Sequence, residues 1–214
     1  MEKAKIRVLA TAGAALFLLA AGILYQTFRI PMPVDFDTKG FPTIGDSKAK
    51  VEFIIFEDFR CAHCCYFSDE IYPQIKKAYV DTGLASYTIV PLAFMNKSKP
   101  IGNAALAVYR QNPNRFFDYA HELFKACIEG KIPDEHELYR MAKKVGGINL
   151  VRLEECLESH CYYEELENNL HLAQRLMGKE FGTPTLYING VPGPTSSFKA
   201  VQSKIEGILK RERP

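Results

Sequence analysis

Two apolar segments separated by a helical pattern restrict the fold of this 214-residue chain. Residues 50–56 and 84–92 are mostly apolar and rich in β-branched and aromatic side chains, which is typical of buried central strands. Between them, residues 62–80 repeat apolar side chains four residues apart and predict a helix, which Pro73 bends and Gly83 ends. A strand, a helix and a second strand in this order predict an α/β fold.

The rest of the chain divides into a helical part and a second strand-containing part. Residues 100–178 have helical periodicity almost throughout, interrupted only by short loop signals. Strand character returns at residues 185–188, and Asn189-Gly190 then marks a turn. A short proline-limited segment predicts an edge strand, and residues 197–211 predict a final helix. The order therefore predicts an α/β unit that a block of helices interrupts.

The N-terminus has the pattern of a targeting segment. Lys3, Lys5 and Arg7 precede an uncharged, mostly apolar stretch from Val8 to about Phe28. About 20 apolar residues are enough to cross a bilayer, and the preceding cations predict that the bulk of the chain is exported. A cleaved signal peptide is the alternative. We favour an uncleaved anchor, because the apolar run continues without a polar cleavage region.

Composition limits the classes of function. A net charge of +2, without a basic cluster or a glycine-rich phosphate loop, gives no reason to expect nucleic-acid binding. The apolar fraction of 47% is that of a globular protein with a substantial core. Six cysteines are many for a reducing compartment but too few for a scaffold held mainly by disulfides.

Three of the six cysteines lie in the segment Cys61-Ala62-His63-Cys64-Cys65, where a predicted strand passes into a predicted helix. The first turn of a helix has unpaired N–H groups and the positive end of the helix dipole, so a thiolate at Cys61 is stabilised and its pKa falls. His63 adds positive charge or a hydrogen bond. We therefore predict Cys61 as the exposed nucleophile and Cys64, one turn further, as the resolving thiol of a redox-active disulfide.

Two other readings of these thiols are half of a zinc site and an inert structural disulfide. Zinc usually takes four ligands in two pairs, and the best second pair, Cys156 with His160 or Cys161, has unfavourable spacing within a helical segment. We therefore expect no metal here.

The remaining cysteines are assigned less directly. Cys65 is expected to be buried and reduced, as a small apolar residue. A structural disulfide between Cys156 and Cys161, across a predicted helix break, is the first candidate pairing, and Cys127 with either of them is the second. Geometry decides between these pairings, and sequence does not supply it.

Taken together, four segments of the chain resemble the DsbA family of exported thiol–disulfide oxidoreductases, which have a thioredoxin fold with an inserted helical domain. The resemblance extends over about residues 40–211, and Ala62 stands where the family usually has proline. The matching segments are the lead-in Gly45–Ala49, the active-site run Phe56–Cys64, the cis-proline loop and turn Gly182–Gly190, and the C-terminal helix pattern Pro192–Ile205.

The resemblance implies a division of the chain into regions. A thioredoxin-like domain is expected to combine residues 43–99 with 179–214, and an all-helical insertion is expected at 100–178. A membrane segment at 1–28 and a linker at 29–42 are expected to precede them.

The resemblance also implies further site residues. A cis peptide bond at Thr183-Pro184 is expected to turn the Thr183 backbone toward Cys61, so that a client chain pairs there like an added strand. In such folds an acid below the active site takes a proton from the resolving cysteine, and Glu57 and Asp58 are both candidates. A solvated charge at the strand end is the other reading of these two acids.

The sequence therefore predicts an exported oxidoreductase that donates its Cys61–Cys64 disulfide to cysteine-containing polypeptides, with no metal or organic cofactor. The resemblance implies that a DsbB-like membrane oxidase restores the disulfide. It also implies a place in the bacterial cell envelope, anchored in the inner membrane with the catalytic domain in the periplasm, or secreted after cleavage. The alternatives are a disulfide isomerase or reductase kept reduced, and a membrane-tethered binding or assembly factor without redox turnover.

Overall fold

The structure is a computed structural model that describes residues 13, 16–22 and 33–211. The chain divides into two compact units, Met1–Met32 and Pro33–Pro214. Residues 16–22 of the first unit are helical and exposed. Within the described residues, no helix combines the length and the apolar character needed to cross a membrane. Most of the predicted membrane segment, and residues 29–32 of the predicted linker, lie outside the described part of the chain.

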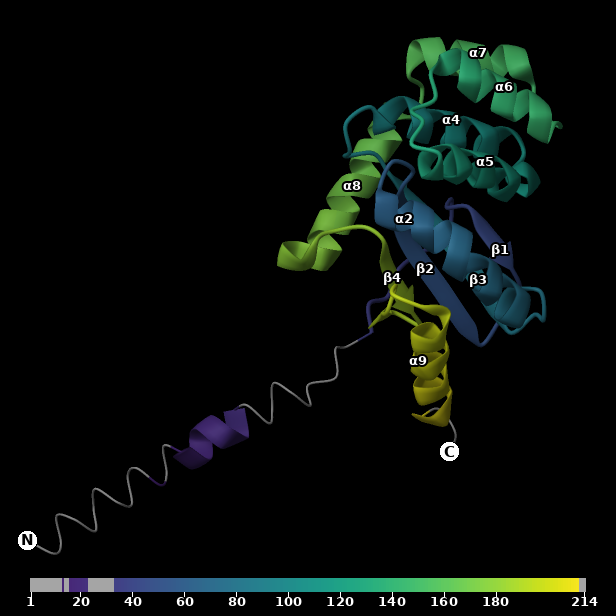
Figure 1. The fold of residues 1–214 in the computed structure, drawn as a ribbon. Helices are drawn as coiled ribbons and strands as arrows, with labels where there is room; N and C mark the ends of the chain where they lie inside the picture. The colour runs from purple at the N-terminus through teal and green to yellow at the C-terminus, as the bar shows by residue number, and fades with distance from the viewer. Residues whose placement is uncertain (1–12, 14–15, 23–32, 212–214) are drawn as a thin grey trace, which may run out of the picture. The chain divides into compact units, whose positions relative to one another are not determined.

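The second unit is built on a five-stranded sheet with the strand order β1-β3-β2-β4-β5 (Figure 1). The predicted strands form its centre: β2 (Val51–Asp58) and β3 (Ala85–Leu92) pair in parallel. β4 (Thr185–Ile188) runs antiparallel to β2, and β5 (Val191–Gly193) runs antiparallel to β4 at the edge. The α/β architecture and the edge position of the proline-limited strand are thus confirmed.

The opposite edge of the sheet is a strand that the sequence pattern does not reveal. β1 (Thr43–Gly45) has three residues, too few to show a periodicity, and pairs antiparallel with β3. Gly45 has a positive φ of 96°, and a β-carbon there would collide with the carbonyl oxygen of Ala85. Only glycine therefore allows the chain to turn away from β3 at this point.

The predicted helix over residues 62–80 is continuous but not uniform. It consists of α2 (Ala62–Tyr66), the π-helical η1 (Phe67–Ile71), α3 (Tyr72–Ile75) and the π-helical η2 (Lys76–Val80). Pro73 lies at the start of α3. Because proline has no N–H for the preceding turn, the wider π-helical turn before it accommodates the missing bond.

The helical block lies between β3 and β4 in the chain. In Figure 1, α4 to α7 gather at the end of the sheet where α2 begins. α6 begins after Asp134, which forms a reciprocal capping box with Glu137, and ends at Gly146. The helices of the block and the two short 3-10 turns are α4 (Ser98–Gln111), η3 (Pro113–Arg115), α5 (Phe116–Ile128), α6 (Glu135–Val145), α7 (Leu150–Ser159), α8 (Tyr163–Met177) and η4 (Gly178–Glu180).

The side chains of β2 alternate between two apolar layers, as the period of a strand requires. Phe53 and Ile55 belong to the larger core, which includes residues of α2 to α5 and of α9 (Phe198–Arg211). Ile54 and Phe56 face the smaller core on the other side, which α8 covers. The same alternation places Glu57 on the side of the larger core and Asp58 on the other.

The described part of the predicted linker, residues 33–42, is packed onto the sheet. Val34, Phe36 and Phe41 are partly buried against the smaller core, and the Val34 N–H donates to the Gly190 carbonyl at 2.8 Å. These residues form no helix or strand, as their proline and glycine residues predict. They nevertheless cover apolar surface of the sheet.

Candidate active site

Cys61 occupies the N-cap position of α2, directly after the central strand β2. Its backbone is extended, with φ −77° and ψ 117°, and its carbonyl accepts the Cys65 N–H at 2.9 Å. Cys61 retains 8% of its surface exposure, whereas Cys64 is fully buried. Both are free thiols, so the structure represents the dithiol form.

The two thiols have opposite electrostatic environments. A hydrogen bond with the Cys64 thiol, a hydrogen bond with the Thr183 side chain and the backbone N–H groups of Cys64 and His63 together lower the pKa of Cys61 from 9.0 to about 5, against the effect of burial. Burial, the hydrogen bond to Cys61 and the negative charge of Glu57 raise the pKa of Cys64. At neutral pH the pair therefore consists of a Cys61 thiolate and a Cys64 thiol.

The imidazole of His63 is exposed, and the contribution of this residue to the Cys61 pKa comes from its backbone N–H. This differs from the expectation that the ring itself supplies charge or a hydrogen bond. The first turn of α2 provides the stabilisation instead, because its N–H groups have no helical partner.

The loop before β4 brings a second segment to Cys61. The peptide bond between Thr183 and Pro184 is cis, as the resemblance implies. The Cys61 sulfur lies 3.3 Å from the Thr183 carbonyl oxygen, to which it donates when protonated. Thr183 is only partly buried, and Cys61 retains 8% of its exposure, so this backbone remains accessible beside the sulfur.

Glu57 lies beneath the thiols and is fully buried. Neither of its carboxyl oxygens has a hydrogen-bond partner among the described residues. Burial, together with the negative charge of the Cys61 thiolate, raises the pKa of this carboxyl well above 4.5. A buried carboxyl with a raised pKa is able to exchange a proton with a neighbouring thiol.

Asp58 is also fully buried but has a different environment. One oxygen accepts the Arg60 N–H at 2.9 Å, and the other accepts the N–H groups of Phe94 and Met95 at 3.0 Å. Asp58 therefore fixes the turn into α2 and the loop after β3. The structure therefore distinguishes the two candidate proton acceptors: the Asp58 oxygens accept three N–H groups, whereas the Glu57 oxygens accept none among the described residues.

The loop after β3 borders the site. The Arg60 guanidinium donates to the Asn96 carbonyl, which adds a second attachment beside that of Asp58. Phe94 packs edge-on against Phe181, two residues before Thr183, with ring centroids 5.2 Å apart. Phe94 is 38% exposed, so an apolar rim lies next to the cis-proline loop.

The structure corrects the assignment of Cys65. Cys65 is bonded to Cys127, 62 residues away, so the prediction that Cys65 is reduced and the pairing of Cys127 with Cys156 or Cys161 are both wrong. The fold brings α5 onto the start of α2, where the Phe59 and Phe124 rings lie 4.9 Å apart. No local pattern marks this contact.

Cys156 and Cys161 form a second disulfide, across the end of α7. His160, between them, has a left-handed backbone with φ 56° that ends the helix. A simple count would have found the remaining pair, since Cys65 and Cys127 are the two cysteines left once 61–64 and 156–161 are matched.

Other features of the described residues are separate from the thiols. No group of three or more His, Cys, Asp or Glu side chains in these parts of the chain is arranged to hold a metal ion. A cleft of about 810 Å³ between Lys97, Ile132, Tyr139 and Leu157 is not lined by any of the cysteines.

The comparisons with known proteins agree with this site. The family model described as Thioredoxin matches residues 37–206. Disulfide bond formation protein D of Bacillus subtilis is 30% identical over 183 residues, covering 80% of this chain and 78% of that protein. The probable protein D of Bacillus anthracis is 27% identical over 174 residues, covering 79% of this chain and 78% of that protein.

Solved structures give the same result. DsbA of Chlamydia trachomatis has a TM-score of 0.74 at 29% identity, covering 85% of this chain and 100% of that chain. Oxidised BdbD of Bacillus subtilis has a TM-score of 0.73 at 26% identity, covering 85% and 97%. The fold is thus thioredoxin-like, and the chain belongs to the thioredoxin family and, within it, to the DsbA family of thiol–disulfide oxidoreductases.

Proposed function

We propose that this oxidoreductase works as an oxidase, which donates the Cys61–Cys64 disulfide to exported polypeptides that contain cysteine. The observation that carries the proposal is the contrast between the two thiols, with a Cys61 pKa of about 5 and a raised Cys64 pKa. A thiol of low pKa is a good leaving group, and a stabilised dithiol makes the corresponding disulfide oxidising.

The exchange proceeds in two steps. A client thiolate attacks the Cys61 sulfur, a client–Cys61 bond forms, and Cys64 leaves as a thiolate that takes up a proton. A second client thiolate then attacks the client sulfur of this mixed disulfide, and Cys61 leaves as a thiolate. Two electrons pass from the client to the Cys61–Cys64 pair, and the client gains one disulfide.

Glu57 is the proposed source of the proton that Cys64 takes up. Its raised pKa favours the protonated carboxyl, and its carboxylate charge, when present, interacts with both thiols. When the disulfide is restored, the carboxylate takes the proton back. The accessible Thr183 carbonyl, held by the cis bond to Pro184, is the proposed pairing point for the client backbone.

The N-terminal charge and hydropathy pattern supports the location that we propose. Three cations before an apolar stretch favour an anchor in the inner membrane, with the oxidoreductase domain in the periplasm. This arrangement would hold the enzyme beside a DsbB-like oxidase that restores the disulfide. Membrane fractionation of the expressed full chain, together with the mass of its N-terminal peptide, distinguishes an anchored protein from a cleaved one.

A client-oxidation assay tests the proposed function. The oxidised full chain is mixed with reduced, unfolded ribonuclease, and client thiols are counted over time. We expect the wild type to remove client thiols and Cys61→Ala to remove none, because the mixed disulfide cannot form. Equal rates for both proteins would overturn the proposal.

The direction of the reaction is tested separately. Thiols are trapped with acid and an alkylating reagent in intact cells before the protein is isolated. An oxidised Cys61–Cys64 pair supports the oxidase. A dithiol there would instead assign the protein as an isomerase or reductase.

A further inference from the structure

A third sulfur lies beside the redox pair. Cys65 directly follows Cys64 and stands four residues after Cys61, whose carbonyl accepts its N–H. Residues four apart on a helix lie on one face, with β-carbons about 5–6 Å apart. The Cys65 sulfur lies 3.8 Å from the Phe59 carbonyl oxygen, so it points back toward the segment that leads into Cys61.

In the structure this sulfur is withheld from exchange. It is bonded to Cys127 at the end of α5, and Cys65 is only 2% exposed, so no client sulfur reaches it. A free thiol at the same place would need no client access, because Cys61 lies one helical turn before it, at the N-cap of α2.

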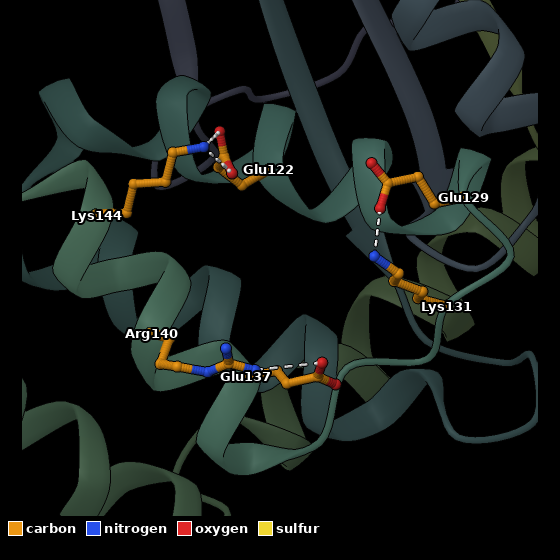
Figure 2. A network of polar contacts seen from close by, with 6 residues as sticks. All are labelled: Glu122, Glu129, Lys131, Glu137, Arg140 and Lys144. Carbon is orange, nitrogen blue, oxygen red and sulfur yellow. Dashed lines mark hydrogen bonds and ion pairs between the residues drawn. The ribbon is translucent and has the colours of Figure 1, made fainter.

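The contact between α2 and α5 does not depend on the disulfide alone. The Phe59 and Phe124 rings pack at 4.9 Å, and both side chains are buried. α5 is also joined to α6 by the Lys144–Glu122 ion pair, at 2.7 Å, which Figure 2 shows. Exposed ion pairs contribute only about 0–1 kcal/mol, so this ion pair adds little. The apolar packing of Phe59 against Phe124 therefore provides most of the contact between α5 and the start of α2. A chain without the disulfide is therefore expected to keep this arrangement.

We propose that the Cys65–Cys127 disulfide protects the redox pair from a competing thiol within the same helix. The inference rests on the proposed function. In a chain without Cys127, the Cys65 thiolate attacks Cys61 in the mixed disulfide. A Cys61–Cys65 bond forms, the client–Cys61 bond breaks, and the client sulfur leaves as a thiolate that takes up the proton released when the Cys65 thiol ionised. The client is released reduced, and no external oxidant or reductant is consumed.

Two variants that lack the same disulfide provide the first test. Cys127→Ala leaves Cys65 as a free thiol, whereas the double variant Cys65→Ala/Cys127→Ala removes both sulfurs. We expect a loss of client oxidation in Cys127→Ala that the second substitution restores. Cys156→Ala/Cys161→Ala, which removes the other disulfide, is the matched control and keeps its activity.

Because both variants lose the same cross-link, their difference isolates the Cys65 thiol. Circular dichroism and thermal unfolding check that each variant is folded. Equal activity of the single and double variants, whether full or reduced, would overturn the inference while leaving the proposed function intact. A wild-type protein without Cys61-dependent oxidation would overturn the proposed function instead.

A second measurement detects the competing bond directly. In Cys64→Ala/Cys127→Ala, the tryptic peptide of residues 61–76 contains Cys61 and Cys65 as its only cysteines. After mild oxidation and alkylation we expect this peptide to be two hydrogens lighter and unlabelled, because the two sulfurs are bonded. A peptide that carries two alkyl groups would contradict the inference, even if the activity assay were limited by folding.

Discussion

Cys61 and Cys64 stand three residues apart on one short helix, and the structure assigns them opposite protonation states. Cys61 is at the N-cap, where backbone N–H groups of the first turn lower its pKa, whereas Cys64 is buried beside Glu57. The same helix start thus supplies both an ionised sulfur and a neutral one. This asymmetry gives each thiol a separate task in exchange.

The ionisation of Cys61 is directly measurable. With a pKa of about 5, the thiolate should form well below the ordinary value of 9.0. We expect the alkylation rate of the reduced protein to rise with pH to a plateau, with a midpoint near pH 5. Cys64→Ala serves as the control in which only Cys61 reacts. This substitution also removes the largest stabilising hydrogen bond, so its midpoint should be higher. A wild-type midpoint near that of free cysteine would contradict the assignment.

Glu57 should make stability depend on pH. Its pKa is raised in the folded state, chiefly by burial, so the folded protein holds a proton that the unfolded chain releases above about pH 4.5. Stability from this group is therefore complete at low pH and is lost as the pH rises. Glu57→Gln does not titrate, so we expect the oxidised variant to gain stability over the oxidised wild type between about pH 4 and pH 7.

Urea unfolding at both pH values measures this gain. Asp58→Asn is the matched control, since Asp58 is equally buried but bonded to three N–H groups. A difference between Glu57→Gln and wild type that stays constant with pH would exclude a shifted carboxyl.

At the scale of elements, the start of α2 is fixed from two directions. Asp58 ties the turn before it to the loop after β3, and the Cys65–Cys127 disulfide ties its first turn to α5. Cys61 lies between these attachments. Its position relative to the Thr183 carbonyl is therefore set by elements far apart in the sequence.

The two disulfides should contribute unequally to stability. They close loops of different length, with sequence separations of 62 and 5 residues. From the entropy of loop closure, loss of Cys65–Cys127 should cost about 4 kcal/mol of unfolding free energy and loss of Cys156–Cys161 about 2 kcal/mol. Urea unfolding of the two double alanine variants measures both values. A larger loss from the shorter loop would show that packing around α7 outweighs chain entropy.

Local signals predicted most of the elements. β2, β3 and β4 are marked by their own apolar residues, and the helical block between β3 and β4 is marked by its periodicity. Contacts between distant segments account for what was missed. β1 exists because β3 offers it an edge, and the Cys65–Cys127 bond exists because α5 packs on α2.

The candidate site was predictable to a similar degree. The sequence places Cys61 and Cys64 at a helix start, and the resemblance supplies the Thr183-Pro184 loop. It does not distinguish Glu57 from Asp58, because the pleat of β2 and the loop after β3 decide which carboxyl is bonded and which lies under the thiols.

At the scale of the whole molecule, the thiol asymmetry should appear as a difference between redox forms. The folded dithiol has a Cys61 pKa of about 5, below that of the unfolded chain, so its thiolate stabilises the reduced protein above that pH. The oxidised protein lacks this group. We therefore expect the reduced form to be the more stable one near neutral pH, and the difference to shrink as the pH falls through about 5.

Denaturant unfolding of both forms at several pH values provides the measurement. Cys61→Ser can neither ionise in this range nor form the disulfide, so its single form should lack the loss of stability through about pH 5 that we expect of the reduced wild type. A reduced form that is less stable than the oxidised form near neutrality would contradict an oxidising disulfide.

The edges of the sheet also bear on the proposed exchange with unfolded clients. β1 and β5 are each three residues long, and Pro192 in the middle of β5 has no N–H to offer. Extended apolar segments therefore find few unpaired backbone groups with which to form a strand at either edge of the sheet. If the proposed clients are unfolded chains, they can react at Cys61 and leave without starting an aggregate at the edges of the sheet.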